Sequence, residues 1–103
     1  MMTRETALKA IKECRHKIDD LDLRILELLN ERTRVVEDIG RAKRVLKMPI
    51  YEPKREDEVY NNIISHNGGP LPAGAVRRVF ERIIDEMRDI QKLRMIEEQQ
   101  NSE

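Results

Sequence analysis

The chain has 103 residues, enough for one small domain, and its 20 lysine and arginine residues balance its 20 aspartate and glutamate residues. A net charge of +0 gives no overall field that would hold the chain on nucleic acid or an anionic membrane. Because aromatic residues make up only 3% of a chain rich in Leu, Ile, Glu, Lys and Arg, helices are favoured over strands.

The first predicted helix runs from about Thr3, a suitable N-cap residue, to about Lys47. It contains no proline, and its one glycine, Gly40, costs about 1 kcal/mol relative to alanine. A helix of about 44 residues is about 65 Å long, whereas a compact domain of about 100 residues has a radius of gyration near 13 Å. The rest of the chain cannot wrap such a helix. It must therefore break or pack against a second copy, and we expect an intertwined homodimer.

The second predicted helix begins at Pro53, because proline suits the first position of a helix, and runs to about His66. One of its faces carries the apolar residues Val59, Ile63 and Ile64.

The stretch NGGP, at residues 67–70, predicts a helix stop and a turn. The third helix is expected to begin near Pro72 or Ala73 and to run to about Glu98, followed by a polar tail that frays. Its apolar stripe consists of Val76, Phe80, Ile83, Ile84, Met87 and Ile90.

Charged residues interrupt the apolar stripe of the first helix, which we call the seam. Arg32 and Lys43 are 11 positions apart on it. On an ideal helix their directions differ by about 20° and they lie about 16 Å apart, so both can lean towards one small ligand. Arg15 lies about 25 Å from Arg32 and points about 100° away, so it would reach that pocket only from a second, antiparallel copy. Steps of three and four positions define the seam as Ile11, Arg15, Ile18, Asp22, Ile25, Leu29, Arg32, Val36, Ile39, Lys43 and Leu46.

Each polar residue also has a purely structural interpretation. A seam cation can pair with a carboxylate or extend its charged end to water, and Asp22 can pair with a basic neighbour. Gln91, one turn beyond Met87 on the third helix, can hydrogen-bond between helices. Arg55 and Glu56 can be a solvated helix start. Only the combination of four cations with two hydrogen-bonding side chains in an apolar dimer indicates a site for an anion.

Three stretches in a fixed order resemble a known family over about residues 11–91. They are ECRHKIDDLDLRILELLNERTRVVEDIGRAK, IYEPKRE and IIDEMRDIQ. Together they resemble the all-α AroQ class of chorismate mutases, especially the mutase domains fused ahead of DAHP synthases, in which an NGGP-like turn also occurs. No synthase domain follows here, so the resemblance is to a free-standing mutase. It implies three helices per chain, an interlocked dimer with two active sites, and conversion of chorismate to prephenate in Phe and Tyr biosynthesis without metal or cofactor.

The resemblance also implies a catalytic role for four side chains. Lys43 and Gln91 match the donors to the ether oxygen of the substrate. Arg32 matches the carboxylate-binding arginine of the same chain. Glu56 matches the acceptor of the ring hydroxyl.

Four further residues match substrate-binding positions. Arg15 matches the arginine donated by the partner chain, and Arg55 matches an arginine near the carboxylates. Glu52 stands where the family often has Asp, at a position that contacts the substrate through its backbone. Met87 stands where many members have a small polar residue, which removes a hydrogen bond to a carboxylate.

Two other classes of function remain open. The chain can be a non-catalytic helical dimer that regulates a partner such as DAHP synthase, or a small helical nucleic-acid binder. The neutral charge argues against the second class, and the presence of Arg32, Lys43 and Gln91 together favours catalysis.

The remaining signals concern cysteine, histidine and the N-terminus. A single cysteine, Cys14, excludes an internal disulfide, and His16 and His66 lack metal-ligand spacing with it. The charged N-terminus has no apolar core of a signal peptide, and no apolar run reaches the roughly 18–20 residues that cross a bilayer. We therefore expect a cytoplasmic protein without a membrane or nucleic-acid partner.

Overall fold

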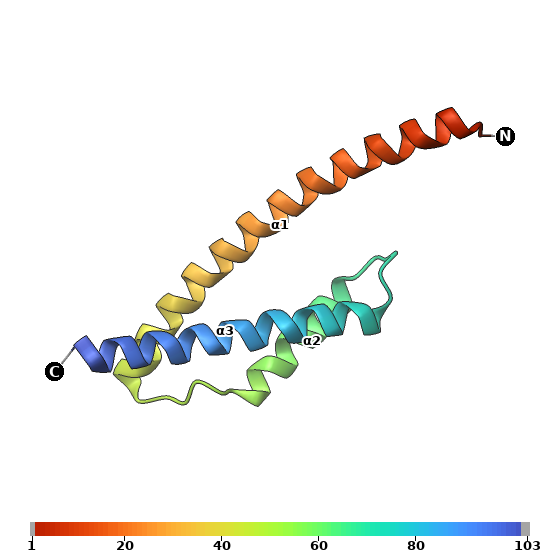
Figure 1. The fold of residues 1–103 in the computed structure, drawn as a ribbon. Coiled ribbons are helices and arrows are strands. Elements are labelled where there is room, and N and C mark those ends of the chain that lie inside the picture. Colours follow the sequence, from red (N-terminus) through yellow and green to blue (C-terminus); the bar gives the residue numbers. More distant parts are fainter. Residues whose placement is uncertain (1, 102–103) are drawn as a thin grey trace. The chain divides into compact units, whose positions relative to one another are not determined.

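A computed structural model describes residues 2–101, and in these residues the secondary structure is entirely helical. The helices are α1 (Arg4–Leu46), α2 (Pro53–His66) and α3 (Ala73–Asn101), as Figure 1 shows. The predicted all-α fold with a long first helix is confirmed. No helix within residues 2–101 combines the length and the apolar composition needed to cross a membrane.

Helix α1 begins where the capping chemistry predicts. The Thr3 side-chain oxygen accepts a hydrogen bond from the Thr6 amide at 3.1 Å, which satisfies one of the amides left unpaired at a helix start. The helix then continues for 43 residues without interruption.

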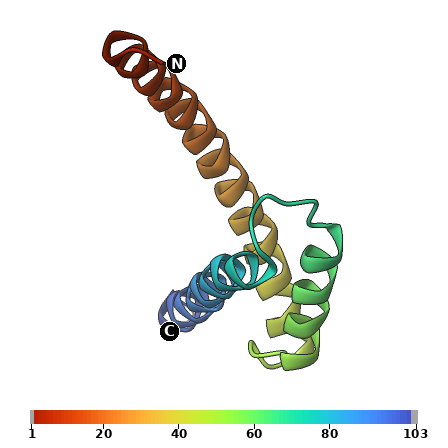
Figure 2. The same ribbon diagram turned by 90° about the vertical axis from the view of Figure 1, so that its right-hand side faces the viewer.

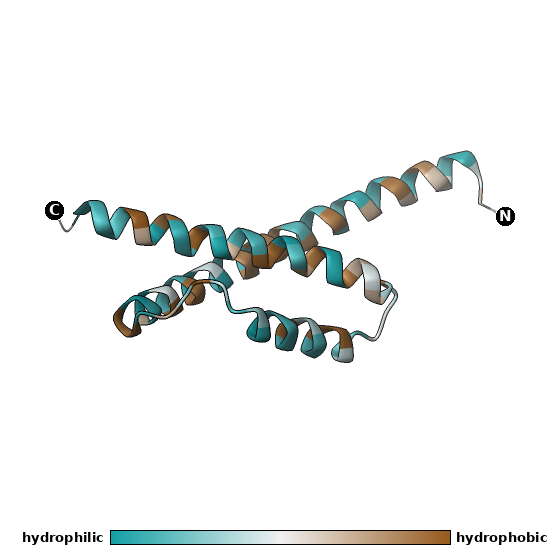
Figure 3. Ribbon diagram, turned by 90° about the horizontal axis from the view of Figure 1, so that it is seen from below, coloured by the Kyte–Doolittle hydropathy of each residue, from teal (hydrophilic) through white to brown (hydrophobic). Residues whose placement is uncertain are grey.

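The part of α1 before Val35 forms its own packing unit and exposes its apolar side chains. Ile11, Ile18 and Ile25 of the seam are 46%, 54% and 53% exposed, although such residues are usually buried. Apolar residues recur along this part of the helix between hydrophilic ones (Figure 3). An exposed apolar stripe of this kind is typical of an interaction surface.

From Val35 onward the chain forms a second packing unit, in which α2 and α3 lie side by side (Figure 2). The last turns of α1 belong to this unit and contact α3, since Glu37 pairs with Arg94 at 2.6 Å. Its core is small and draws on all three helices. The buried residues are Val36, Gly40 and Lys43 of α1, Tyr60 of α2, and Val76, Ile84, Met87 and Gln91 of α3.

The turn between α2 and α3 has the expected position. The Asn67 side chain accepts a hydrogen bond from the Gly69 amide at 2.9 Å and donates one to the Leu71 carbonyl at 2.8 Å. Gly69 has a φ of +78°, a conformation that favours glycine. The residue types of the turn therefore determine both the stop of α2 and the restart at Ala73.

Helix α1 ends at Leu46, within one residue of the predicted end at about Lys47, because Lys47 adopts a left-handed conformation with a φ of 56°. The predicted end of the third helix needs correction. Helix α3 continues to Asn101 instead of ending near Glu98, because Glu and Gln are good helix formers and no glycine or proline interrupts them. The last two residues of the expected tail lie outside the described residues.

Candidate active site

The C-terminus of α1 positions Lys43, which belongs to the buried core. The Met48 amide donates to the Lys43 carbonyl at 2.8 Å, and the Lys47 amide donates to the Arg44 carbonyl at 3.2 Å. With Lys47 in the left-handed conformation, these two bonds form a Schellman motif. The motif turns the chain back sharply, so that the Ile50 carbonyl accepts a hydrogen bond from the Lys43 ammonium at 3.0 Å.

Three oxygen atoms surround the ammonium of Lys43. Besides the Ile50 carbonyl, the Glu52 carboxylate lies 2.6 Å from Nζ, and the Gln91 amide oxygen lies 3.5 Å from it. Lys43 and Gln91 are each only 8% exposed. Because an ammonium only donates, it holds the oxygen of the Gln91 amide towards itself and leaves the NH2 group to donate to another acceptor. The structure thus brings together the two predicted ether-oxygen donors.

Gly40 lies where α3 packs against the end of α1. A Cβ atom at this buried position would lie 3.5 Å from Cγ of Gln91 and 3.3 Å from the end of the Arg44 side chain. A larger side chain would push Gln91 away from Lys43. The glycine that weakens the helix therefore lies directly against Gln91, where a Cβ would be in ordinary contact but a longer side chain would not fit.

A second ion pair joins α2 to α3. Glu56, in the first turn of α2, lies 3.1 Å from Nε of Arg88, and these side chains are 17% and 29% exposed. The Arg88 guanidinium also lies over the Tyr51 ring, 5.3 Å from its centroid. Sequence analysis missed Arg88 because only the apolar stripe of the third helix was followed. Its position three residues before Gln91 was the available signal, since residues that far apart share a helix face.

Tyr60 closes the interface between α2 and α3 and was also missed. It is 7% exposed, and the Arg77 guanidinium lies 4.2 Å from the centroid of its ring. Burial, followed by the negative charge of Glu56, raises the pKa of the Tyr60 phenol above its ordinary value of 10.0. The neutral phenol is therefore the stable form in the folded chain. An open hollow of about 330 Å³ beside it is lined by Tyr51, Pro53, Glu56, Asp57, Tyr60, Arg77, Glu81 and Asp85.

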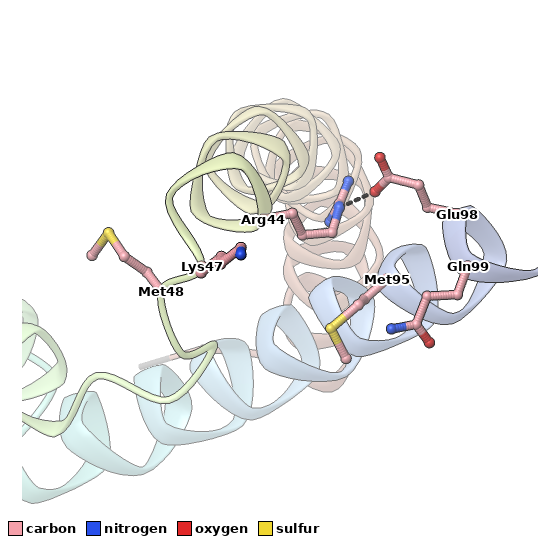
Figure 4. A pocket seen from close by; sticks show the side chains of 6 residues that line it. All are labelled: Arg44, Lys47, Met48, Met95, Glu98 and Gln99. Atoms are coloured by element: carbon pink, nitrogen blue, oxygen red, sulfur yellow. Dashed lines mark ion pairs between the residues drawn. The ribbon is translucent and has the colours of Figure 1, made fainter. Parts of the chain in front are cut away.

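Another hollow, of about 460 Å³, lies at the end of α1 (Figure 4). Arg44 pairs there with Glu98 of α3. Its lining residues are Arg44, Lys47, Met48, Met95, Glu98 and Gln99, so none of the predicted site residues contributes to it.

The remaining predicted residues lie outside the Lys43 cluster. Arg55 is exposed and pairs with Glu58 at 3.3 Å, although it lines the same hollow of about 480 Å³ as Glu52. Met87 is buried one turn before Gln91 on α3. Arg15 and Arg32 lie on α1 before Val35, where Arg15 lines an apolar hollow and Arg32 is half-buried. The substrate contacts of these residues remain predictions.

The structure offers no metal-ligand arrangement within residues 2–101. No three or more His, Cys, Asp and Glu side chains gather there in a way that could hold a metal ion. Cys14 is an exposed free thiol, and Nδ1 of His66 lies 2.7 Å from the carbonyl of Asn62.

Comparison with known proteins places this geometry in a family. The family described as chorismate mutase type II matches residues 14–92, which include Lys43 on α1 and Gln91 on α3. The chorismate mutase of Methanocaldococcus jannaschii is 32% identical over 98 residues, which cover 91% of this chain and 95% of that protein. The solved chorismate mutase (Form II) of Thermus thermophilus is 36% identical with a TM-score of 0.79, and the match covers 81% of this chain and 94% of that one.

Longer relatives carry a second activity. The bifunctional chorismate mutase/prephenate dehydratase of Aquifex aeolicus is 35% identical over 89 residues, and the match spans only about a quarter (25%) of its length. These relatives are thus free-standing mutases and a dehydratase fusion, and none of them is a DAHP synthase fusion. With more than half of its length matched and these relatives above 30% identity, the chain belongs to the chorismate mutase type II family, the AroQ class.

Proposed function

We propose that this chain catalyses the Claisen rearrangement of chorismate to prephenate, an isomerisation within one molecule. Family membership supports the reaction, and the pairing of Lys43 with Gln91 is the observation that carries it. Chorismate has two carboxylates and an enolpyruvyl ether, and negative charge develops on the ether oxygen as its C–O bond stretches. The reaction requires no nucleophile, metal or redox cofactor.

The two buried donors act on that developing charge. The Lys43 ammonium and the NH2 group of Gln91 point their hydrogen atoms at the ether oxygen, in a site that largely excludes water. Donors fixed before the reaction need no reorganisation in the transition state, and each is typically worth about 3–4 kcal/mol. Glu56, which Arg88 holds at the start of α2, accepts the hydrogen bond of the ring hydroxyl.

Arginines orient the substrate in this proposal. Arg15, Arg32 and Arg55 bind the two carboxylates, because a planar guanidinium pairs with a carboxylate through two parallel hydrogen bonds. They hold the enolpyruvyl group over the ring in the reactive conformer, which removes much of the entropic barrier.

A homodimer completes the site, with Arg15 supplied by the partner chain. The exposed apolar residues of α1 support this assembly, because a second copy would bury the stripe that its own chain leaves exposed. The residues that the second copy would cover include Leu8, Ile11, Ile18, Leu21, Ile25 and Leu28, each more than 45% exposed in the single chain.

The first experiment adds purified protein to chorismate, without cofactor, and follows the loss of its ultraviolet absorbance. Acid conversion of prephenate to phenylpyruvate identifies the product. Turnover that Arg32→Ala abolishes while the protein stays folded supports the proposal. A folded dimer that leaves chorismate unchanged refutes it, and the regulatory alternative would then be tested with a DAHP synthase.

The second experiment tests the shared site by mixing Arg15→Ala with Arg32→Ala. In a mixed dimer one of the two sites has both arginines, so activity should return as subunits exchange. The control is each variant mixed with itself under the same conditions. No recovery, with exchange demonstrated by a mass-tagged subunit, would contradict the donation of Arg15 across the interface.

A further inference from the structure

Oxygens of the chain itself already surround the ammonium of Lys43. An ammonium has three N–H donors, and Lys43 has three oxygens around it, from Ile50, Glu52 and Gln91. A ligand can therefore take a donor from Lys43 only if one of these oxygens gives up its position.

Glu52 is the acceptor that can move. The Ile50 oxygen belongs to the backbone between two helices, and Gln91 is 8% exposed within α3. The Glu52 side chain is 34% exposed, against 10% for the side chain of Lys43. Glu52 is also the N-cap residue of α2, yet its side chain makes no capping hydrogen bond. Its carboxylate thus has another favourable place, in water beside the positive end of the helix dipole.

The Glu52 carboxylate is also the nearest of the three oxygens to Nζ of Lys43. With 2.6 Å between Nζ and Oε1, the two side chains form a close ion pair, and the negative charge offsets the field of the ammonium. While Glu52 pairs with Lys43, an approaching dianionic substrate meets a neutralised lysine and the like charge of the carboxylate beside it. Binding is therefore weaker while Glu52 stays in place.

We propose that Glu52 is an exchangeable counter-ion of Lys43, which pairs with the lysine in the empty site and yields to a carboxylate of the bound substrate. This inference rests on the proposed function and deepens it. Glu52 then acts through Lys43 as a positioning residue that sets substrate affinity, in addition to the backbone contact predicted from the sequence.

Removal of the Glu52 carboxylate should have opposite effects on the stability of the protein and on substrate binding. In the empty protein the carboxylate compensates a nearly buried cation, so its removal should lower the melting temperature. In the complex the substrate supplies the negative charge, so the same removal should strengthen binding. A residue with a merely structural role would weaken both stability and activity when changed.

The test compares Glu52→Gln with Glu86→Gln. Glu86 is an exposed residue of α3 that pairs with exposed Arg82, so its variant makes the same chemical change away from the site. Glu52→Gln should lower the KM for chorismate about 3- to 10-fold, with a smaller change in kcat and a lower Tm. Glu52→Asp, which keeps the charge, should return KM towards the wild-type value, and Glu86→Gln should leave KM and kcat unchanged.

Calorimetry with prephenate provides a second readout that needs no turnover, because prephenate also carries two carboxylates. Its Kd should fall in Glu52→Gln by the same factor as KM. Wild-type binding of prephenate without any tightening in Glu52→Gln would overturn the exchange alone. A lower kcat with an unchanged or higher KM would also overturn it, because Glu52 would then orient Lys43 in the complex. Wild-type protein with neither turnover nor prephenate binding would overturn the proposed function, and the exchange with it.

Discussion

Gln91→Glu is the substitution that most directly tests the chemistry of the buried pair. A glutamate has the shape of glutamine, but when ionised it cannot donate to the ether oxygen. Only its protonated form restores that donor. The wild-type amide does not titrate, so wild-type activity should be nearly flat from about pH 6 to 8.

The expected magnitude follows from the position of the side chain. The amide oxygen lies 3.5 Å from Nζ of Lys43, and two unit charges at that distance attract by about 5 kcal/mol at an effective dielectric constant near 20. The new carboxylate would therefore hold Lys43 as well as removing one donor. Loss of one such donor costs about 10²- to 10³-fold in kcat, so near-neutral activity should fall by at least that factor.

The assay is kcat for chorismate loss from about pH 4.5 to 8, with the wild type measured in parallel. The activity of Gln91→Glu should rise as the pH falls, because the protonated acid regains the donor. Circular dichroism at each pH controls for unfolding. A variant as active as wild type at pH 7.5, or one with a flat pH profile, would refute the role of Gln91 as an ether-oxygen donor.

Three further changes test how the fold supports the site. Lys47→Gly should raise the free energy of unfolding by about 0.5–1 kcal/mol, because glycine adopts the positive φ of this position without strain; an unchanged value in urea melts would contradict this. Burial and the charge of Glu56 raise the pKa of Tyr60, so the folded chain binds that proton more tightly than the unfolded chain. The stability that this proton contributes should therefore be present below about pH 10 and be lost as the pH rises through the higher folded pKa, and Tyr60→Phe should flatten this loss in melts between pH 9 and 11. Arg88→Gln should lower the free energy of unfolding by about 1–2 kcal/mol, because it leaves the Glu56 carboxylate without its partner. The exposed control Arg82→Gln should lower it by less than about 0.5 kcal/mol in the same urea melts.

Local rules account for most of the architecture that the sequence predicted. Thr3 caps the first helix, Pro53 starts the second, and the NGGP turn separates the second from the third. Each of these signals acts within a few residues, so no tertiary contact is needed to interpret it. The C-terminal end of α3 was missed because the polar residues after Glu98 are good helix formers and carry no stop signal.

The sequence also placed Lys43 and Gln91 on apolar helix faces, and the resemblance to the family assigned both to one predicted site. Only the tertiary structure revealed that Glu52 pairs with Lys43 and that Arg88 pairs with Glu56. Helical periodicity gives the face on which a residue lies, but it does not give the offset between one helix and its neighbour. That offset depends on how α2 and α3 pack and on the sharp turn after Lys43, and it decides which charges of different helices meet.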